Sequence, residues 1–534
     1  MRTAPTWLIA GLLALVLTGL GPPIGAQQPL DERHFDVLIR GGRVLDGAGN
    51  PWFRADVGVQ DGRIVAVGRL PSATASEEVD ARGLHVAPGF IDVHSHAGGG
   101  LATEDRSHAR PLLAQGITTV VVNPDGGGPV DLATQRRELL EDGLGVHAAL
   151  LVPHGSIRNE VLGMEDRPPT ETELERMRAL VRTGMEEGAF GLSSGVFYAP
   201  GSFADTDELV ALSSVIAEFG GVYTSHIRDE SNYTIGVLEA VEEVIAVARE
   251  AEVRGIVTHV KALGPPVWGF SEAIALRVER ARDEGVEVFA DQYPYTASAT
   301  GLAAALVPRW AQAGGDASFE ERLADAEARR RIEREMHENL ARRGGAERIQ
   351  FRRFEEDPSL EGRTLDAVAR ERGVDPVDLT LELLQIGAPA IVSFNMLGED
   401  VERLMRRPWT MTGSDGGLPE WEVGVPHPRS YGAFPRKLRQ YVVEDGVLTL
   451  EEAVRSMTGL SATVFGMEER GFIRTGAVAD VVVFDLDEVH DPATFTDPHQ
   501  LAEGMEHVLV NGEFAIRDGA FTGVRAGEVL RGGR

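Results

Sequence analysis

Two histidines separated by a single residue, His94 and His96, follow a short apolar run and are the first candidates for chemistry. Alternate residues of a β-strand point to the same face, so both imidazoles can face one point. Two further histidines, His226 and His259, and the carboxylate of Asp415 each end another apolar run. Imidazole is a common metal ligand, and a catalytic zinc needs roughly three protein ligands and a water. These five residues therefore predict a metal centre that activates water.

Composition limits the chemistry and the partners. The 534 residues include no cysteine, which excludes disulfides, iron–sulfur clusters, thiolate zinc ligands and cysteine nucleophiles. Asp and Glu number 83 against 52 Lys and Arg, so the net charge is −31. Nucleic acids and anionic membranes require clustered positive charge. We therefore expect a small-molecule substrate and no nucleic-acid partner, while the oligomeric state stays unknown.

Lysine is rare in this chain, which uses arginine for almost all of its positive charge. Its two lysines are Lys261 and Lys437. Lys261 comes two residues after His259, so on a strand it faces the same side, where it can bind a carboxylate as a point charge. Lys437 lies in an Arg-rich stretch, and we expect it to be solvated.

The elements that position the candidate ligands are short apolar runs that alternate with helical stretches such as 206–218 and 234–251. Eight of these runs are candidate strands: 90–94, 118–123, 148–154, 190–193, 222–226, 256–259, 286–291 and 410–415. This alternation is typical of parallel βα units, and eight units predict a (β/α)8 TIM-type barrel of the α/β class. Its active site would lie at the C-terminal ends of the strands. A further run, 391–394, leaves the strand count open.

Short alternating apolar segments near both chain ends predict a second, all-β unit. The expected domains are a β-sandwich built from 27–87 and 469–534, and a barrel over 88–468 that carries a charged helical insertion at 316–345. Two unrelated terminal hairpins are the alternative to the sandwich. The insertion is interpreted as a solvated helical segment with i,i+4 ion pairs, or as a lid over the barrel mouth.

The first 26 residues have the pattern of a secretory signal peptide. Arg2 precedes the charge-free apolar run 7–20, and small residues end at Ala26. The run is short for a membrane span, which needs about 20 residues. We expect a Sec-type leader and a periplasmic or secreted protein that is not a lipoprotein, touching the membrane only before cleavage. An uncleaved anchor is the alternative.

The segment 88–96, Pro-Gly-Phe-Ile-Asp-Val-His-Ser-His, resembles the first-strand signature of the metal-dependent amidohydrolase superfamily. Within it, the chain resembles the N-acyl-D-amino-acid deacylases (D-aminoacylases). The other matching stretches are 116–122, 191–198, 224–230, 258–261, 291–298, 413–416 and 427–432. They follow the family order and cover most of residues 36–515, which makes the combination far more specific than the His-x-His pattern alone.

The resemblance implies a role for each metal candidate. His226 and His259 match ligands of a tightly bound Zn2+, and His94 and His96 match a second, weaker position with Asp415 beside it. Asp415 also matches the general base and acid.

The third ligand departs from the family, which commonly has Gly-Asn-Cys-Gly where this chain has Asn-Pro-Asp-Gly at 123–126. Asp125 falls on the cysteine, and a carboxylate can bind zinc, although the harder site leaves Mn or Fe open. The alternative is that Asp125 is only a turn residue.

The resemblance also implies that Lys261, Tyr293 and Arg429 hold the substrate's α-carboxylate, with Tyr295 as an alternative to Tyr293. A carbamylated Lys261 that bridges two metals is a further alternative. The implied activity is hydrolysis of an N-acyl-D-amino acid to a carboxylate and a free D-amino acid, by metal-activated water with Asp415 as base and acid. Activity on cyclic amides or dipeptides, and an inactive ligand-binding barrel, are the other hypotheses.

Overall fold

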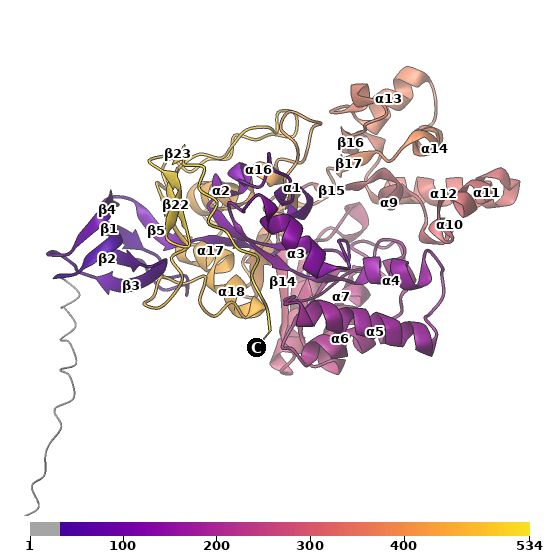
Figure 1. Ribbon diagram of the computed structural model, residues 1–534. Helices are drawn as coiled ribbons and strands as arrows, with labels where there is room; N and C mark the ends of the chain where they lie inside the picture. Colours follow the sequence, from indigo (N-terminus) through magenta and orange to yellow (C-terminus); the bar gives the residue numbers. More distant parts are fainter. Residues whose placement is uncertain (1–31, 534) are drawn as a thin grey trace, which may run out of the picture.

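The computed structural model describes residues 32–533, and the expected leader at 1–26 lies outside them (Figure 1). Within the described range, no helix has both the length and the apolar character needed to span a bilayer. The molecule has three parts in Figure 1: a β-sheet from both chain ends at the left, a barrel in the middle, and helices α9 to α14 at the upper right.

Parallel strands form the barrel in chain order, in two sheets, β6–β8–β9 and β10–β11–β12–β13–β14–β18. Their bounds are β6 (Phe90–Asp92), β8 (Ile117–Val122), β9 (His147–Leu150), β10 (Val152–Pro153), β11 (Gly191–Gly195), β12 (Val222–His226), β13 (Arg254–Val257), β14 (Val288–Gln292) and β18 (Thr410–Thr412). β9 and β10 are two halves of one strand position. β7 (Ser95–His96) pairs with β19 (Gly416–Gly417), so the last strand meets the first. All eight predicted runs are therefore barrel strands.

The strand sequences explain why they lie inside. β8 reads Ile-Thr-Thr-Val-Val-Val and every residue is buried, as expected for a β-branched strand of a parallel sheet covered on both faces. The helices around the strands are α1 (Gly98–Leu101), α2 (Arg110–Leu113), α3 (Leu132–Glu141), α4 (His154–Leu162), α5 (Glu171–Glu186), α6 (Thr206–Ala217), α7 (Val237–Glu250), α8 (Ser271–Asp283), α15 (Gly398–Met405), α16 (Arg429–Arg436), α17 (Leu450–Met457) and α18 (Gly459–Phe465). α7 buries residues at helical spacing, including Val237, Val241, Val244 and Ala248.

Strands from both chain ends share one sheet. Its members are β1 (His34–Val44), β2 (Phe53–Gln60), β3 (Arg63–Gly68), β4 (Thr74–Asp80), β5 (His85–Pro88), β20 (Val481–Phe484), β21 (Met505–Val510), β22 (Glu513–Arg517) and β23 (Ala520–Phe521). The two halves join where β5 pairs antiparallel with β20. They also share an apolar core, in which Val57 and Ile64 lie in one cluster with Val481 and Leu509.

A buried ionic cluster connects this sheet to the barrel. Asp480, just before β20, lies 3.1 Å from Nε2 of His147 on β9 and is paired with Arg470. His147 therefore joins the two units.

The chain between β14 and β18 forms a unit with its own apolar core. Its elements are β15 (Ser298–Gly301), α9 (Leu302–Leu306), α10 (Arg309–Gln312), α11 (Gly315–Ala324), α12 (Ala326–Arg342), β16 (Ile349–Arg353), α13 (Leu365–Arg372), α14 (Pro376–Ile386) and β17 (Ala390–Ser393). We call residues 298–393 the inserted unit. The ninth candidate run is β17, which pairs with β15 and β16 outside the barrel. The charged segment 316–345 is part of this larger unit, and its helix α12 buries Ile332 and Met336.

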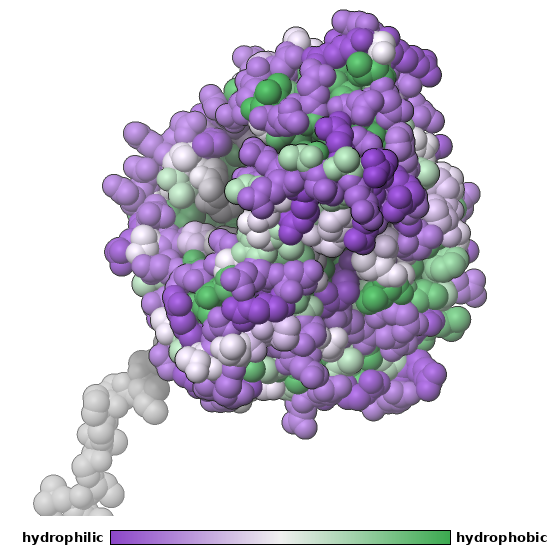
Figure 2. All heavy atoms as spheres, turned by 90° about the vertical axis from the view of Figure 1, so that its right-hand side faces the viewer, coloured by the Kyte–Doolittle hydropathy of each residue, from purple (hydrophilic) through white to green (hydrophobic). Residues whose placement is uncertain are grey.

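The surface seen in Figure 2 is mainly hydrophilic, with separate apolar areas. The exposed large apolar side chains, such as Trp52, Leu276 and Ile386, lie far apart in the sequence and on different elements. The excess of acidic over basic residues, 83 against 52, is consistent with a mainly hydrophilic surface.

Lys437 differs from the expectation, because its side chain is buried rather than solvated. It begins a π-helical segment, η6 (Lys437–Glu444), and is 2% exposed. Its Nζ donates to the hydroxyls of Thr412 and Ser456 at 2.8 Å each. Burial lowers the pKa of Lys437 from 10.5 to about 7. The Arg-rich sequence around Lys437 does not indicate this burial, because it depends on how the segment packs under β18.

The buried lysine predicts a pH-dependent stability. Because folding lowers this pKa, the folded chain binds fewer protons than the unfolded chain between about pH 7 and 10.5, and the free energy of unfolding rises with pH over this range. Below about pH 7 the lysine is charged in both states, so the full free-energy cost of burying the charged amine applies. We expect the free energy of unfolding of the parent to rise about 3 kcal/mol more than that of Lys437→Met between pH 6 and 9. Denaturant titrations at both pH values measure this, and Arg439→Met on the same segment is the control. Parallel changes in the parent and Lys437→Met would contradict the prediction.

Candidate metal centre

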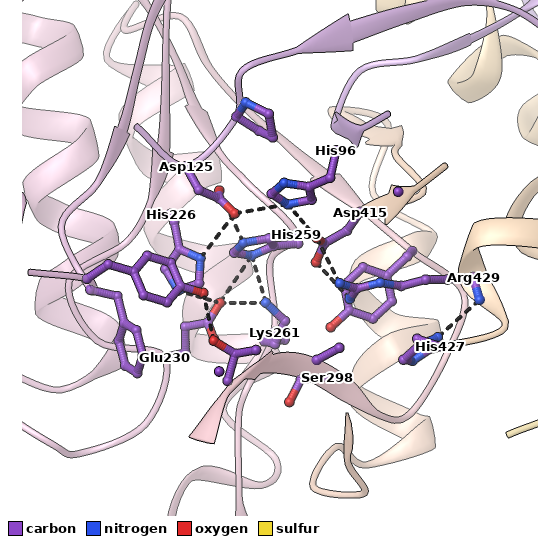
Figure 3. A pocket seen from close by; sticks show the side chains of 18 of the residues that line it. His96, Asp125, His226, Glu230, His259, Lys261, Ser298, Asp415, His427 and Arg429 are labelled. Carbon is purple, nitrogen blue, oxygen red and sulfur yellow. Dashed lines mark hydrogen bonds and ion pairs between the residues drawn. The ribbon is translucent and has the colours of Figure 1, made fainter. Parts of the chain in front are cut away.

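The carboxylate of Asp125 lies at the centre of the predicted ligands, just beyond β8 (Figure 3). Its Oδ1 is 3.4 Å from Nε2 of His94 and 3.6 Å from Nε2 of His259. Its Oδ2 is 3.5 Å from Nε2 of His96 and 3.7 Å from Nδ1 of His226. Histidines from three other barrel strand ends thus converge on one carboxylate.

These side chains form two candidate metal sites that share Asp125. One site contains His94, His96, Asp125 and Asp415, and the other contains Asp125, His226 and His259. In each group the ligand atoms lie within 4.8 Å of one another. Two ligands bound at about 2.1 Å with tetrahedral angles lie about 3.4 Å apart, which agrees with the distances around Asp125.

The hydrogen bonding of these groups fits a metal. Both ring nitrogens of His94, both ring nitrogens of His226 and Oδ1 of Asp125 are buried without a hydrogen-bond partner. Buried polar atoms are almost always paired, so a cluster of unpaired ones needs an occupant. Nitrogen and oxygen donors suit zinc, and also manganese or iron.

The backbone around the centre is unusual. Asp125, His259 and Asp415 have φ values of 55°, 36° and 50°, in the left-handed region that non-glycine residues rarely adopt. Such conformations cost about 1–3 kcal/mol each and cluster at functional sites.

The Asp125 turn is held by β11. Ser193 Oγ donates to the carbonyl of Asn123 at 2.6 Å and accepts from the amide of Gly126 at 3.2 Å. A Cβ on Gly195 would lie 2.0 Å from the Asp125 carbonyl oxygen, so only glycine fits there. The Gly-Leu-Ser-Ser-Gly motif therefore positions Asp125 and offers no serine nucleophile.

Two acidic residues that had no assigned role orient His259. Asp291, at the end of β14, accepts a hydrogen bond from the His259 amide at 2.7 Å. Glu230 lies 3.1 Å from Nδ1 of His259 and forms an ion pair with Lys261. Both residues lie in stretches that carry the family resemblance. They belong to other segments than His259, so the local sequence does not show that they contact it.

Lys261 is buried, at 3% exposure, and its Nζ is 2.7 Å from Nδ1 of His259. Its charge is balanced by Glu230, with which its Nζ forms an ion pair. This arrangement favours a free ammonium over a carbamylated bridging lysine.

Asp415 and Arg429 form a buried ion pair. Arg429 Nη2 donates a hydrogen bond to Asp415 Oδ1 at 2.9 Å, and Nη1 lies 2.8 Å from Oδ2 without making a hydrogen bond. Burial by itself would raise the pKa of Asp415, but the charge of Arg429 and the hydrogen bond from His96 outweigh it and lower the pKa. Asp415 is therefore ionised and can accept a proton.

Tyr293 lies between the two cations, with Lys261 Nζ 5.6 Å and the Arg429 guanidinium 4.8 Å from its ring centroid. Its hydroxyl points to the sulfur of Met396, at 3.6 Å. Tyr295, the alternative, packs on His427 and is not among the pocket-lining residues.

All the predicted site residues except the buried His94 line one pocket of about 400 Å3, together with residues that the sequence did not single out. Those are Phe197, Tyr198, Glu230, His427 and side chains of the inserted unit, including Ser298, Arg343 and Arg352. Such a volume suits a small molecule.

The sequence of the chain matches the model of the amidohydrolase family over residues 77–516. A D-aminoacylase of Alcaligenes xylosoxydans xylosoxydans is 36% identical over 94% of this chain and 98% of its own length.

Two solved structures are similar over 93% of this chain and all of theirs. One is N-acyl-D-glutamate deacylase from Bordetella bronchiseptica, complexed with zinc and a phosphonate that mimics the tetrahedral intermediate, at 36% identity and a TM-score of 0.79. The other is a D-aminoacylase whose binuclear metal centre shows one-metal activation and second-metal attenuation, at 34% identity and a TM-score of 0.80.

The shared position of Asp125 predicts that both metal positions depend on it. We expect Asp125→Ala to weaken metal binding by about 100-fold or more, because it removes one ligand from each group. Metal analysis after equilibrium dialysis at fixed free zinc measures this. Asp131→Ala, at the exposed cap of α3, is the control and should leave the metal content unchanged. Full occupancy in Asp125→Ala would show that Asp125 is only a turn residue.

Proposed function

The chain belongs to the amidohydrolase family, and we propose that it hydrolyses the amide bond of N-acyl-D-amino acids, releasing a carboxylate and a free D-amino acid. Relatives that match almost its whole length include a D-aminoacylase and an N-acyl-D-glutamate deacylase. The observation that carries the proposal is the pair of ligand groups joined by Asp125, with Asp415 beside them in a pocket of substrate size.

A divalent ion held by these residues would polarise the amide carbonyl and lower the pKa of a water molecule to about 7. We propose zinc, with His226, His259 and Asp125 as its tight site and His94, His96, Asp125 and Asp415 as a second, weaker position. All the atoms that would bind it are provided by barrel strand ends.

Asp415 has the geometry for proton transfer. It lies 3.2 Å from Nε2 of His96, at the edge of the metal groups, and faces the pocket. It would take the proton from the attacking water and then donate it to the departing amine nitrogen. One carboxylate can serve both steps if it lies within hydrogen-bond reach of both atoms.

The cations of the pocket explain why the substrate would be an amino acid derivative. Arg429 can bind a carboxylate bidentately, and Lys261 can bind one as a point charge. Tyr293 lies between them. Because Arg429 already contacts Asp415, a substrate α-carboxylate would share the guanidinium with it.

Two further proposals concern the ends of the chain. We infer that the sheet of both chain ends forms a small β-sandwich beside the barrel, and that residues 1–26 are a cleaved leader that directs the protein to the periplasm or medium. A mature N-terminus at residue 27, found by N-terminal sequencing, is the expected result.

Replacing the proton carrier should separate chemistry from metal binding. We expect Asp415→Asn to keep the metal of the tight site, because His226, His259 and Asp125 remain, and to lower kcat by about 1,000-fold, since an amide cannot carry the proton. Steady-state kinetics and metal analysis on the same sample measure both. Activity within tenfold of the parent would contradict the assignment of Asp415.

Chiral assays test the reaction itself. Zinc-loaded protein should hydrolyse N-acetyl-D-amino acids, leave the L enantiomers, hydantoins and dipeptides largely intact, and lose activity when a chelator removes the metal. Preference for a hydantoin or a dipeptide would support a different amidohydrolase activity. Absence of both bound metal and amidase activity would indicate an inactive ligand-binding barrel.

A further inference from the structure

Two arginines that line the pocket belong to the inserted unit and not to a barrel strand end. Arg343 follows α12, and Arg352 lies on β16. Both line the pocket that contains the candidate metal centre. Neither comes from the stretches that resemble the deacylase family.

Counting the pocket charges shows that these two arginines are not balanced. The acidic residues of the lining are Asp125, Glu230 and Asp415. Asp415 is paired with Arg429, Glu230 is paired with Lys261, and Asp125 lies among the histidines. Arg343 and Arg352 are the lining cations that remain, and in the described part of the chain neither forms an ion pair with an acidic side chain.

The surroundings of Arg352 differ from those of an ordinary surface arginine. Its side chain is half-buried and its Nε is buried without a hydrogen-bond partner. The neighbouring Arg353 on the same strand is paired with Glu361 and Glu355. Burial, with the nearby charge of Arg429, lowers the pKa of Arg352 to about 10, so it stays protonated at neutral pH.

Arg343 is more deeply buried, at 1% exposure, and makes little use of its hydrogen-bonding capacity. Its Nη1 donates to Ser393 Oγ at 3.1 Å, its guanidinium lies 6.0 Å from the ring of Tyr233, and its Nε has no partner. An unpaired buried charge is costly, and the cost is recovered when an anion binds.

We propose that Arg352, supported by Arg343, forms a second anion site that binds a carboxylate of the substrate other than its α-carboxylate. This inference rests on the proposed function and narrows its substrate class to N-acyl-D-amino acids with two carboxylates. Guanidinium groups suit this role because they bind carboxylates with parallel, charge-assisted hydrogen bonds. The second carboxylate can belong to the amino acid side chain or to the acyl group.

Paired substrates distinguish these two sources. N-acetyl-D-glutamate against N-acetyl-D-glutamine tests a carboxylate in the side chain, and N-succinyl-D-leucine against N-butanoyl-D-leucine tests one in the acyl group. For one of the two pairs, we expect kcat/KM of the parent to favour the dicarboxylate by about 100-fold. Arg352→Gln should reduce that ratio to within about threefold of one.

Arg353→Gln is the matched control, because it removes a guanidinium from the same strand outside the pocket, and it should keep the parent's ratio. Equal kcat/KM for both members of each pair in the parent would overturn the anion site and leave the proposed function intact. An equal loss on charged and neutral substrates in Arg352→Gln would also overturn it, by assigning Arg352 to the α-carboxylate. Hydrolysis of none of the four substrates would overturn the proposed function and, with it, the anion site.

Discussion

The carboxylate of Asp125 is the point on which the rest of the site depends. Four imidazoles from three other strand ends lie around its two oxygens at 3.4 to 3.7 Å, too far for good hydrogen bonds and suitable for shared ligation. The left-handed backbone at Asp125, the brace from Ser193 and the bare Cα of Gly195 all serve its placement. Asp125 lies in an Asp-Gly-Gly-Gly turn, and these contacts with β11 fix its position.

The absence of cysteine makes this placement necessary. Where the resemblance to the deacylases implies a thiolate, the chain has a carboxylate with two oxygens, and each oxygen faces one histidine of each group. A carboxylate is a harder ligand than a thiolate, so this residue suits manganese and iron as well as zinc. The surrounding acids, Asp291 and Glu230, orient His259 and leave the metal-facing nitrogens without other partners.

Charge pairing divides the pocket into two parts. On the barrel side, Lys261 and Arg429 each have an acidic partner, Glu230 and Asp415. On the side of the inserted unit, the guanidiniums lack acidic partners. The chain has 83 acidic residues, yet none of them forms an ion pair with Arg343 or Arg352 in the described part of the chain. The proposed anion site rests on this difference from the barrel side of the pocket.

The sequence by itself determined the eight barrel strands and the metal candidates at their ends, because apolar periodicity and the strand-end position of polar residues are local properties. The residues His94, His96, His226, His259 and Asp415 could be proposed because strand ends of a barrel share one rim. Asp125 could be proposed only because it aligns with the cysteine of the deacylases that the chain resembles. Tertiary structure decided which residues touch. It placed Glu230 on Lys261, buried Lys437 under β18, removed the run 391–394 from the barrel and brought Arg343 and Arg352 to the pocket from the inserted unit. These contacts join residues distant in sequence or on different elements, and their geometry depends on how whole units pack, which no local pattern encodes.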